Sequence, residues 1–237
     1  MRETRYTSII LKKQPFNEAD EIITVFTKEK GKLRFLAKSV KFSKSKLSGS
    51  LQNLFLVEIT AAKSSSHLPK LIGARVLNNF VNLRQDLEKL KYAFYAQELV
   101  LKFTGDEHKN EKLFNLFLEY LEFLNNHYQR AVLEPALAKF KIGFLETVGF
   151  RITYDKNCAS AQSVGFSNPK GGFTSGGHHR GRNLKCSFEQ FLKLQNLDFN
   201  DLAKASLGEI DELQGILSSF IEYQLERQVK SEKFLLS

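Results

Sequence analysis

The sequence contains no tryptophan, one methionine, four prolines and only two cysteines among its 237 residues. Two cysteines are too few for a disulfide framework, so the sequence predicts a protein of a reducing compartment. No stretch approaches the roughly 18 apolar residues that a membrane-spanning helix needs. The first ten residues, MRETRYTSII, lack the apolar core and the small-residue cleavage site of a secretory signal. We therefore expect a cytoplasmic protein that does not enter a membrane.

Motifs of the common catalytic classes are also missing. The sequence holds no Walker-type phosphate loop, no HExxH motif and no GxSxG nucleophile elbow. The run GGFTSGG at 171–177 resembles a phosphate loop, but it does not end in Lys-Ser or Lys-Thr and follows no predicted buried strand. Carboxylates are scattered along the chain, and no pair stands out as a general acid and base. The sequence therefore favours a protein that is not an enzyme.

Positive charge is abundant, and it is placed unevenly. The formal net charge is +9 at pH 7. Residues 1–80 hold 15 Lys and Arg against 6 Asp and Glu, whereas residues 81–237 hold 20 of each kind. An excess confined to one region indicates a polyanionic partner. The alternative is a solvated lysine-rich face that only keeps the protein dissolved.

The first third of the chain has the texture of a small β-structure. Five short segments rich in β-branched and aromatic residues lie at 6–13, 21–28, 31–37, 51–61 and 68–77. Gly31 stands between the second and the third, as a tight hairpin requires. Five strands leave exposed edges, which closure of the sheet removes. We therefore predict a five-stranded barrel of the oligonucleotide-binding (OB) type in residues 1–80, acting as the nucleic-acid-binding domain.

Beyond residue 80 the apolar residues recur at helical spacing. The predicted helices lie at 84–104, 111–128, 132–148, 187–195 and 209–229. Asn82 is the expected cap of the first helix, Pro135 fits the first turn of the third, and Gly149 is the expected stop. The resulting fold class is α+β and multidomain: the barrel, a helical bundle at 81–150 and 187–237, and a small irregular insert or hairpin at 151–186.

The basic stretch AKSVKFSKSKLSGSLQNL at 37–54 falls between the third and fourth strands and predicts a loop, because it is rich in serine and its lysines form no helical face. Lysine ammonium groups bind phosphates whatever the base sequence. Phe42 is the best candidate for stacking on a base, ahead of Phe16 and Phe35, although core packing is the commoner role of each. The candidate nucleic-acid contacts are Lys12, Lys13, Lys32, Arg34, Lys38, Lys41, Phe42, Lys44 and Lys46.

The insert contains the only residues that suggest a metal. Cys158, His178, His179 and Cys186 could supply four ligands, but structural zinc sites usually pair cysteines at C-x₂₋₄-C spacing. Ala161 stands three residues after Cys158, and Cys186 has no cysteine neighbour. We expect an insert that folds without metal and a protein without a cofactor. Its weak candidate ligands are Cys158, His178 and Cys186.

Several motifs recur in one order along the chain. FNEADEIITVFTKEKGKLRFLAKSVKFSKSKLSGSLQNL at 16–54 contains an acidic strand start, a VFT-x-E-x-G turn, an AKS step, spaced lysines and a G-x-LQ strand entry. LEPALAKFKIGFLETVGF at 133–150 ends in a Gly-aromatic stop and leads into the insert. In order and spacing over roughly residues 5–190, the chain resembles the bacterial recombination mediators of the RecO family.

The resemblance implies an OB-fold joined to a helical domain with a zinc-ribbon-like insert, and a non-enzymatic role in recombinational DNA repair. Such proteins bind single- and double-stranded DNA, anneal complementary strands, and load RecA together with RecR and the single-strand DNA-binding protein, in the cytoplasm at the nucleoid. Many members carry two C-x-x-C pairs. Here Cys158 matches one position, and Ala161, Ser175 and His178 occupy the other three.

The resemblance also bears on partner binding. The family's contact with the single-strand-binding protein maps to the helical domain, where Lys139 and Lys141 are the nearest matching basic residues. Ordinary helix-surface lysines are the alternative. Two other functions stay open at this point: an RNA- or ribosome-associated OB-fold protein, and an interaction module whose basic loop is incidental.

Overall fold

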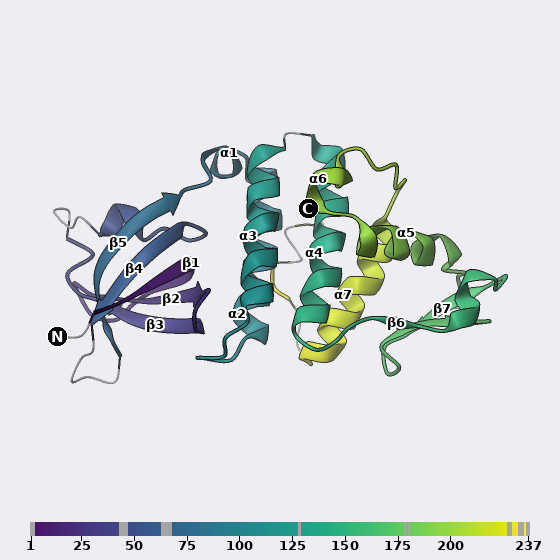
Figure 1. The fold of residues 1–237 in the computed structure, drawn as a ribbon, viewed down its shortest axis with the longest axis horizontal. Coiled ribbons are helices and arrows are strands. Elements are labelled where there is room, and N and C mark those ends of the chain that lie inside the picture. Colours follow the sequence, from purple (N-terminus) through teal and green to yellow (C-terminus); the bar gives the residue numbers. More distant parts are fainter. Residues whose placement is uncertain are drawn as a thin grey trace. The chain divides into compact units, whose positions relative to one another are not determined.

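The computed structural model describes residues 3–42, 47–62, 68–127, 129–177, 179, 181–226, 229–231 and 235, without the side chain of Arg130 (Figure 1). The chain divides into two compact units, Met1–Leu118 and Glu119–Ser237, and each is described by itself. The predicted domain limits at 80, 150 and 186 stay predictions. Among the described residues, no helix combines the length and the apolar composition that crossing a bilayer requires.

The first unit begins with a closed five-stranded barrel. Its strands are β1 (Glu3–Pro15), β2 (Glu21–Thr27), β3 (Gly31–Ala37), β4 (Leu56–Ala62) and β5 (Lys70–Asn78). They are arranged in the order β1-β2-β3-β5-β4. Strand β1 pairs antiparallel with β4 through its first half and with β2 through its second half. The barrel closes where β3 and β5 run parallel at Leu36 and Lys70. The predicted five-stranded OB barrel is confirmed.

The barrel interior is filled by the alternate residues of these strands. Branched aliphatic side chains dominate it, as expected for inward positions of a small barrel. The core residues are Ile10, Ile23, Val25, Phe35, Ala37, Val40, Leu51, Phe55, Val57, Ile59, Ala61 and Leu71. Tyr6 packs against them, with its ring centre 5.8 Å from that of Phe35.

The segment between β3 and β4 differs from the prediction at its end. Residues 51–55 were expected to begin the fourth strand, but the chain turns there instead. Leu54 adopts a left-handed φ of 69°, and the Phe55 N–H donates to the Gln52 carbonyl at 3.1 Å. A short 3₁₀ helix, η1 (Ser48–Ser50), precedes this turn. Leu51 therefore contributes to the core without belonging to a strand.

The helix predicted at 84–104 is α2 (Leu87–Phe103), and a short helix that was not predicted, α1 (Val81–Arg84), precedes it. The prediction of Asn82 as the cap is wrong, because Asn82 lies inside α1. The Asp86 carboxylate caps α2 instead, accepting from the Glu88 and Lys89 N–H groups. An ionised Asp at an N-cap satisfies backbone donors that the helix leaves unpaired. Helix α3 (Glu111–Asn126) follows, and the boundary between the two units falls within it.

The second unit is mostly helical, which confirms that part of the predicted fold. Its elements are η2 (Arg130–Val132), α4 (Leu133–Thr147), α5 (Lys185–Asn196), α6 (Phe199–Leu202) and α7 (Asp211–Leu225). Gly149 takes a φ of 91° just after α4, and the Phe150 N–H donates to the Leu145 carbonyl at 2.7 Å. Gly149 is thus the predicted stop, because glycine reaches left-handed φ without strain. The short α6 was not predicted.

The insert is more ordered than an irregular loop. Strands β6 (Thr153–Tyr154), β7 (Val164–Ser167) and β8 (Gly172–Ser175) form a sheet in the order β6-β8-β7, with η3 (Lys156–Ala159) beside it (Figure 1). A Cβ on Gly172 would lie 2.0 Å from the Thr153 carbonyl oxygen, so only glycine lets β6 approach β8 this closely.

Candidate nucleic-acid interface

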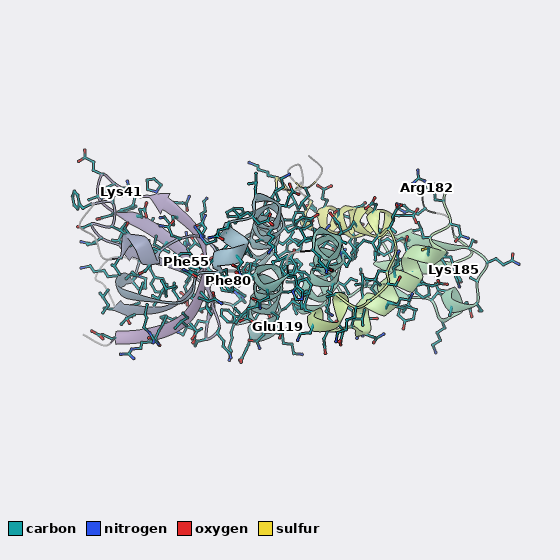
Figure 2. All side chains as sticks on the ribbon, turned by 90° about the horizontal axis from the view of Figure 1, so that it is seen from above. Lys41, Phe55, Phe80, Glu119, Arg182 and Lys185 are labelled. Atoms are coloured by element: carbon teal, nitrogen blue, oxygen red, sulfur yellow. The ribbon has the colours of Figure 1, made fainter. Side chains whose placement is uncertain are left out.

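Two loops meet at one end of the barrel. The first, residues 16–20, joins β1 to β2, and the second, residues 38–42, follows β3. The Ser39 N–H donates to Asp20 Oδ1 at 2.7 Å, and the Lys41 N–H donates to the Ala19 carbonyl at 3.2 Å. Lys41 Nζ also donates to the Asn17 carbonyl at 2.6 Å. These bonds hold the first residues of the basic stretch in a defined conformation. Figure 2 labels Lys41 in this part of the barrel.

Asp20 is the centre of this arrangement. Its carboxylate accepts from the Ser39 N–H and from the Asn17 side-chain amide, at 2.7 and 3.0 Å. The hydrogen bond from Ser39, then that from Asn17, and the positive charges of Lys38 and Lys41 hold the pKa of Asp20 below its usual value. Asp20 therefore stays ionised and fixes both loops.

Two phenylalanines project from these loops. Phe16 is 58% exposed and Phe42 is 59% exposed, although core packing is the commoner role of phenylalanine. Phe16 precedes Asn17 and Phe42 follows Lys41, and Asn17 and Lys41 are joined by a hydrogen bond. Phe35, at 1% exposed, is a core residue and is not a stacking candidate, because its ring faces Tyr6 inside the barrel. We call Phe16, Asn17, Asp20, Lys38, Lys41 and Phe42 the barrel-end cluster.

The remaining predicted lysines differ in what they contact. Lys38 is exposed in the barrel-end cluster, and Lys12 is exposed on β1. Lys13 is half-buried, with its Nζ 3.9 Å from a Glu21 carboxylate oxygen. Lys44 and Lys46 lie outside the described residues.

Lys32 and Arg34 are occupied by partners within the first unit. Lys32 Nζ donates to the Leu101 carbonyl at 3.0 Å and to the Thr104 carbonyl, and it lies 3.6 Å from Asp106 Oδ1. Arg34 donates to Asp106 Oδ2 at 2.7 Å, while about half of its side chain remains exposed. The structure therefore uses Lys32 to hold the α2–α3 loop and leaves only Arg34 of the two open to a ligand.

The same loop covers the start of β3. A Cβ on Gly31 would lie 1.9 Å from the His108 carbonyl oxygen, and Gly31 has a φ of 72°, so this position requires glycine on both counts. A groove of about 560 Å³ runs beside β3, with Lys30, Arg34 and Tyr6 among its lining residues. The groove thus runs along β3, and the barrel-end cluster follows the end of the same strand.

The two lysines expected at a partner surface in the second unit are turned inward. Lys141 is 2% exposed, and its Nζ donates to Gln214 Oε1 and Ser218 Oγ, each at 2.8 Å. Its burial corrects the expectation that it contacts a partner. Lys139 Nζ donates to the Leu194 carbonyl at 3.3 Å and lies 5.4 Å from the centre of the Phe199 ring. Burial lowers the pKa of Lys139, and Asp198 and Glu119 oppose that change.

The residues of the insert do not fit the zinc that the resemblance brings with it. Cys158 is fully buried, and burial raises the pKa of its thiol, whereas zinc binds the thiolate. Ser175 Oγ donates to Asp155 at 2.6 Å, and Cys186 is exposed at the start of α5. His178 lies outside the described residues. Among the described residues, no group of three or more potential ligands converges.

A lysine binds the backbone around Cys158. Lys185 Nζ donates to the Cys158 carbonyl at 2.9 Å and to the Ala159 carbonyl at 2.5 Å. It thereby joins η3 to α5 through a cation, and Figure 2 labels Lys185 in this part of the second unit. The rest of the insert is held by ring contacts, since Phe173 lies 5.0 to 5.3 Å from three other phenylalanine rings. The residues present thus provide a metal-free way of building this insert.

Asn17 and Asp20 were not among the predicted site residues. Both belong to the first loop, where they looked like ordinary turn residues. The signal in the sequence was local: Asn17 is followed three residues later by Asp20, both lie between two predicted strands, and Phe16 precedes them. That pattern predicts an Asx turn, but not its bond to a loop 19 residues further along the chain.

The fold and the site together define a class of protein. A closed barrel with OB topology that presents lysines and exposed aromatic rings on its loops is typical of OB-fold nucleic-acid-binding proteins. The family models described as "Recombination protein O N terminal" and "Recombination protein O C terminal" match residues 1–80 and 84–233. The chain belongs to the RecO family.

Several relatives are similar to this chain, two of them over nearly its whole length. A protein of Dehalococcoides mccartyi (strain CBDB1) named "DNA repair protein RecO" is 28% identical over 236 residues, covering 94% of this chain and 91% of the relative. A protein of the same name from Anaeromyxobacter dehalogenans (strain 2CP-C) is 27% identical over 248 residues, covering 99% and 96%. One from Geobacter metallireducens is 32% identical over 160 residues, covering 68% of this chain and 64% of the relative.

Proposed function

We propose that this protein is a DNA-repair mediator that binds single- and double-stranded DNA through its barrel without reading base sequence. It anneals complementary strands and acts with RecR and the single-strand DNA-binding protein to load RecA. Membership of the RecO family supports the role in recombinational repair, and its relatives are named as DNA repair proteins. The role is non-catalytic and needs no cofactor, and it takes place at the nucleoid in the cytoplasm.

The observation that carries the proposal is the barrel-end cluster. Two loops are locked together by Asp20 and Lys41, and two aromatic rings and two lysines project from them. Lysine ammonium groups attract phosphates, and exposed rings stack on unpaired bases of any sequence. An ammonium has three donors, so Lys41 keeps two for a phosphate after its bond to Asn17. The cluster therefore suits a single strand held by its backbone and by a few bases.

The groove beside β3 extends this surface. Its exposed cations are Lys30 and Arg34, and β3 leads from the groove to Lys38. Asp106, which pairs with Arg34, and Glu107 also line the groove, so Lys30 is the groove cation that forms no ion pair with another described residue. Lys44 and Lys46, outside the described residues, follow the cluster directly in the sequence. Screening of phosphates along such a surface lowers the repulsion between two strands, which lets complementary bases pair.

The test is a charge reversal in the cluster, Lys38→Glu with Lys41→Glu, in the full chain. We expect at least a tenfold loss of affinity for a 20-nucleotide single strand, equal for all base sequences. We also expect a shallower salt dependence, by about 0.7 in slope for each phosphate that the protein no longer neutralises. The annealing rate of complementary strands falls in parallel.

The matched control is Lys193→Glu with Lys204→Glu, which changes the net charge equally at exposed positions of the second unit. Phe42→Ala is a second variant that leaves all charges in place, and we expect it to weaken single-strand binding more than duplex binding. An unchanged salt slope in the charge-reversed protein, with a normal melting curve, contradicts the proposal.

Two further measurements separate the alternatives. Competition between RNA and DNA of the same length and base composition distinguishes a DNA mediator from an RNA-associated barrel protein. Binding of RecR and of the single-strand-binding protein is measured with the same variants. Retained partner binding after loss of DNA affinity supports separate surfaces for DNA and proteins. Unaltered DNA affinity favours a pure interaction module.

A further inference from the structure

The even charge balance of residues 81–237 hides two opposite regions. Residues 151–186 hold six Lys and Arg against the single acid Asp155, whereas 81–150 together with 187–237 hold 14 against 19. The insert is therefore a second positive region on a part of the chain that is otherwise acidic. Its charge density is comparable to that of the basic N-terminal third.

Three cations of the insert lie around one strand of its sheet. Strand β6 is an edge strand in the order β6-β8-β7. Arg151 and Lys156 flank it in the sequence, and both are exposed. Arg151 Nε lies 3.7 Å from a Glu146 carboxylate oxygen, in an ion pair that is open to solvent. Lys170 is exposed in the β7–β8 turn, which meets the start of β6 where the Thr153 N–H donates to the Gly171 carbonyl at 3.0 Å. Three cations thus surround a two-residue strand that forms the edge of the described sheet.

Two aromatic residues are exposed in this region, one in β6 and one before it. Phe150 is 36% exposed and Tyr154 is 47% exposed. The Tyr154 ring makes edge contacts with Phe188 and Phe191, at 5.5 and 6.4 Å between ring centres. These contacts fix the orientation of the ring while nearly half of the side chain remains open. A ring held in this way loses little entropy when a base stacks on it.

The single acid of the region is exposed, but its carboxylate oxygens are engaged by hydrogen bonds within the insert. The Asp155 carboxylate accepts from the Asn157 N–H at 3.0 Å and from Ser175 Oγ at 2.6 Å. These hydrogen bonds, with the charge of Lys170, hold the pKa of Asp155 below its usual value. Lys185 is likewise occupied by η3, and Arg182 lines a hollow with Glu209 and Glu212, so neither belongs to the surface.

We propose that β6 and its surroundings form a second binding site for single-stranded DNA, made of Arg151, Tyr154, Lys156 and Lys170, with Phe150 at its edge. The combination of exposed rings and cations matches unpaired bases joined by phosphates. It does not match a duplex, in which the bases are stacked and covered. Nor does it match a purely acidic peptide, which makes no use of exposed rings.

A second site has a direct consequence for annealing. One molecule then holds two strands at once, one on the barrel and one on the insert. The site rests on the proposed function only in taking DNA as the polyanion. It does not depend on the barrel-end cluster, because its residues belong to the second unit.

The test uses the full chain with the barrel already weakened by Lys38→Glu and Lys41→Glu. Adding Lys156→Glu and Lys170→Glu should lower the remaining affinity for a 20-nucleotide single strand at least tenfold. Adding the control pair Lys193→Glu and Lys204→Glu should lower it less than threefold. Tyr154→Leu should weaken single-strand binding about fivefold, and Tyr154→Phe should restore it.

A second measurement locates the contact without relying on loss of binding. Photocrosslinking of a single strand that carries 5-iodouracil should label Tyr154 in the otherwise unaltered chain. Equal affinities of the insert variant and its control overturn the second site, and so does an equal loss for duplex and single strand. Full affinity of the barrel variant alone overturns the proposed function and leaves the second site standing.

Discussion

The barrel and the insert are both positively charged, but they are built by different means. The barrel has five strands of 7 to 13 residues, paired along their length around a mostly aliphatic core. The insert has three strands of two to four residues, and its core consists of ring contacts among Phe166, Phe173, Phe188 and Phe191. A long ladder of backbone hydrogen bonds sustains the first region, whereas the second depends on a few side chains.

The difference shows where the sequence is free to vary. In the barrel the bonds of Asp20 and Lys41 hold two loops to each other, while the strands are held by backbone ladders. In the insert Lys185 and Asp155 tie η3 to α5 and to β8. Changing these charges should therefore loosen only the loops of the barrel but should destabilise the fold of the insert.

The largest expected effect comes from deleting one ring in each region. Phe35→Ala in the barrel and Phe173→Ala in the insert each remove a side chain that is at most 2% exposed. Each should cost about 3–5 kcal/mol locally. Hydrogen exchange should show loss of protection throughout β1–β5 for the first variant. For the second it should be confined to β6–β8 and adjoining residues of α5. Loss of barrel protection in Phe173→Ala would mean that the two regions are not independent.

A smaller effect is expected from Lys185→Met, which keeps the length of the side chain and removes the ammonium. Its two hydrogen bonds to η3 carbonyls are charge-assisted but partly exposed, so the change should destabilise the insert by about 1–2 kcal/mol. Exchange of the Cys158 and Ala161 amides reports it. A chelator added to the unaltered protein should leave the same amides unaffected. If the chelator destabilises the insert, a metal does bind there.

Acid should loosen the insert through Asp155. Because the pKa of Asp155 is lower in the folded protein than in the unfolded chain, ionised Asp155 stabilises the insert at any pH above its unfolded pKa of about 3.9. That contribution is lost as the pH falls through the lower, folded pKa. Melting curves from pH 6 to pH 2.5 should show this decline, and Asp155→Asn should reduce it. An identical decline in both proteins would exclude Asp155 as its cause.

The smallest effect is expected when the corresponding acid of the barrel, Asp20, is changed. The pKa of Asp20 is also lowered, so its hydrogen bond to Ser39 should weaken only when the pH falls below the pKa of an ordinary aspartate. Asp20→Asn should speed exchange of the Ser39 amide while changing the free energy of unfolding by no more than about 0.5 kcal/mol. A larger loss would show that the barrel depends on its loops as the insert does.

Local patterns in the sequence predicted most of the fold. Strand β3 was predicted at its observed limits, because the signals that define it, Gly31 and the alternation of residues after it, lie within the strand itself. Gly149 ended α4 as expected for the same reason. The cap of α2 was misplaced because Asn82 and Asp86 are equally good caps by residue type. Only the packing of α1 decides between them.

The candidate site was harder to predict, because it depends on contacts between distant parts of the chain. Nothing near Lys32 in the sequence shows that Asp106 and two carbonyls of the α2–α3 region take up its ammonium. Lys141 was misjudged in the same way, since Gln214 lies 73 residues away. The positive charge of the insert, by contrast, can be read from the sequence of residues 151–186 alone. It does not appear in the net charge of residues 81–237, because the acidic excess of the surrounding helices cancels it.

Strand β1 has a further consequence, which concerns how the chain reaches its native state. Its first half pairs with β4, with Glu3 opposite Ala62, and its second half pairs with β2. On the ribosome, the hairpins of β1 with β2 and of β2 with β3 can form as soon as they emerge, but the first half of β1 must wait for β4. Distant pairing of this kind is slow. During synthesis the first residues of β1 therefore remain available to chaperones and proteases until the chain has grown past Ala62.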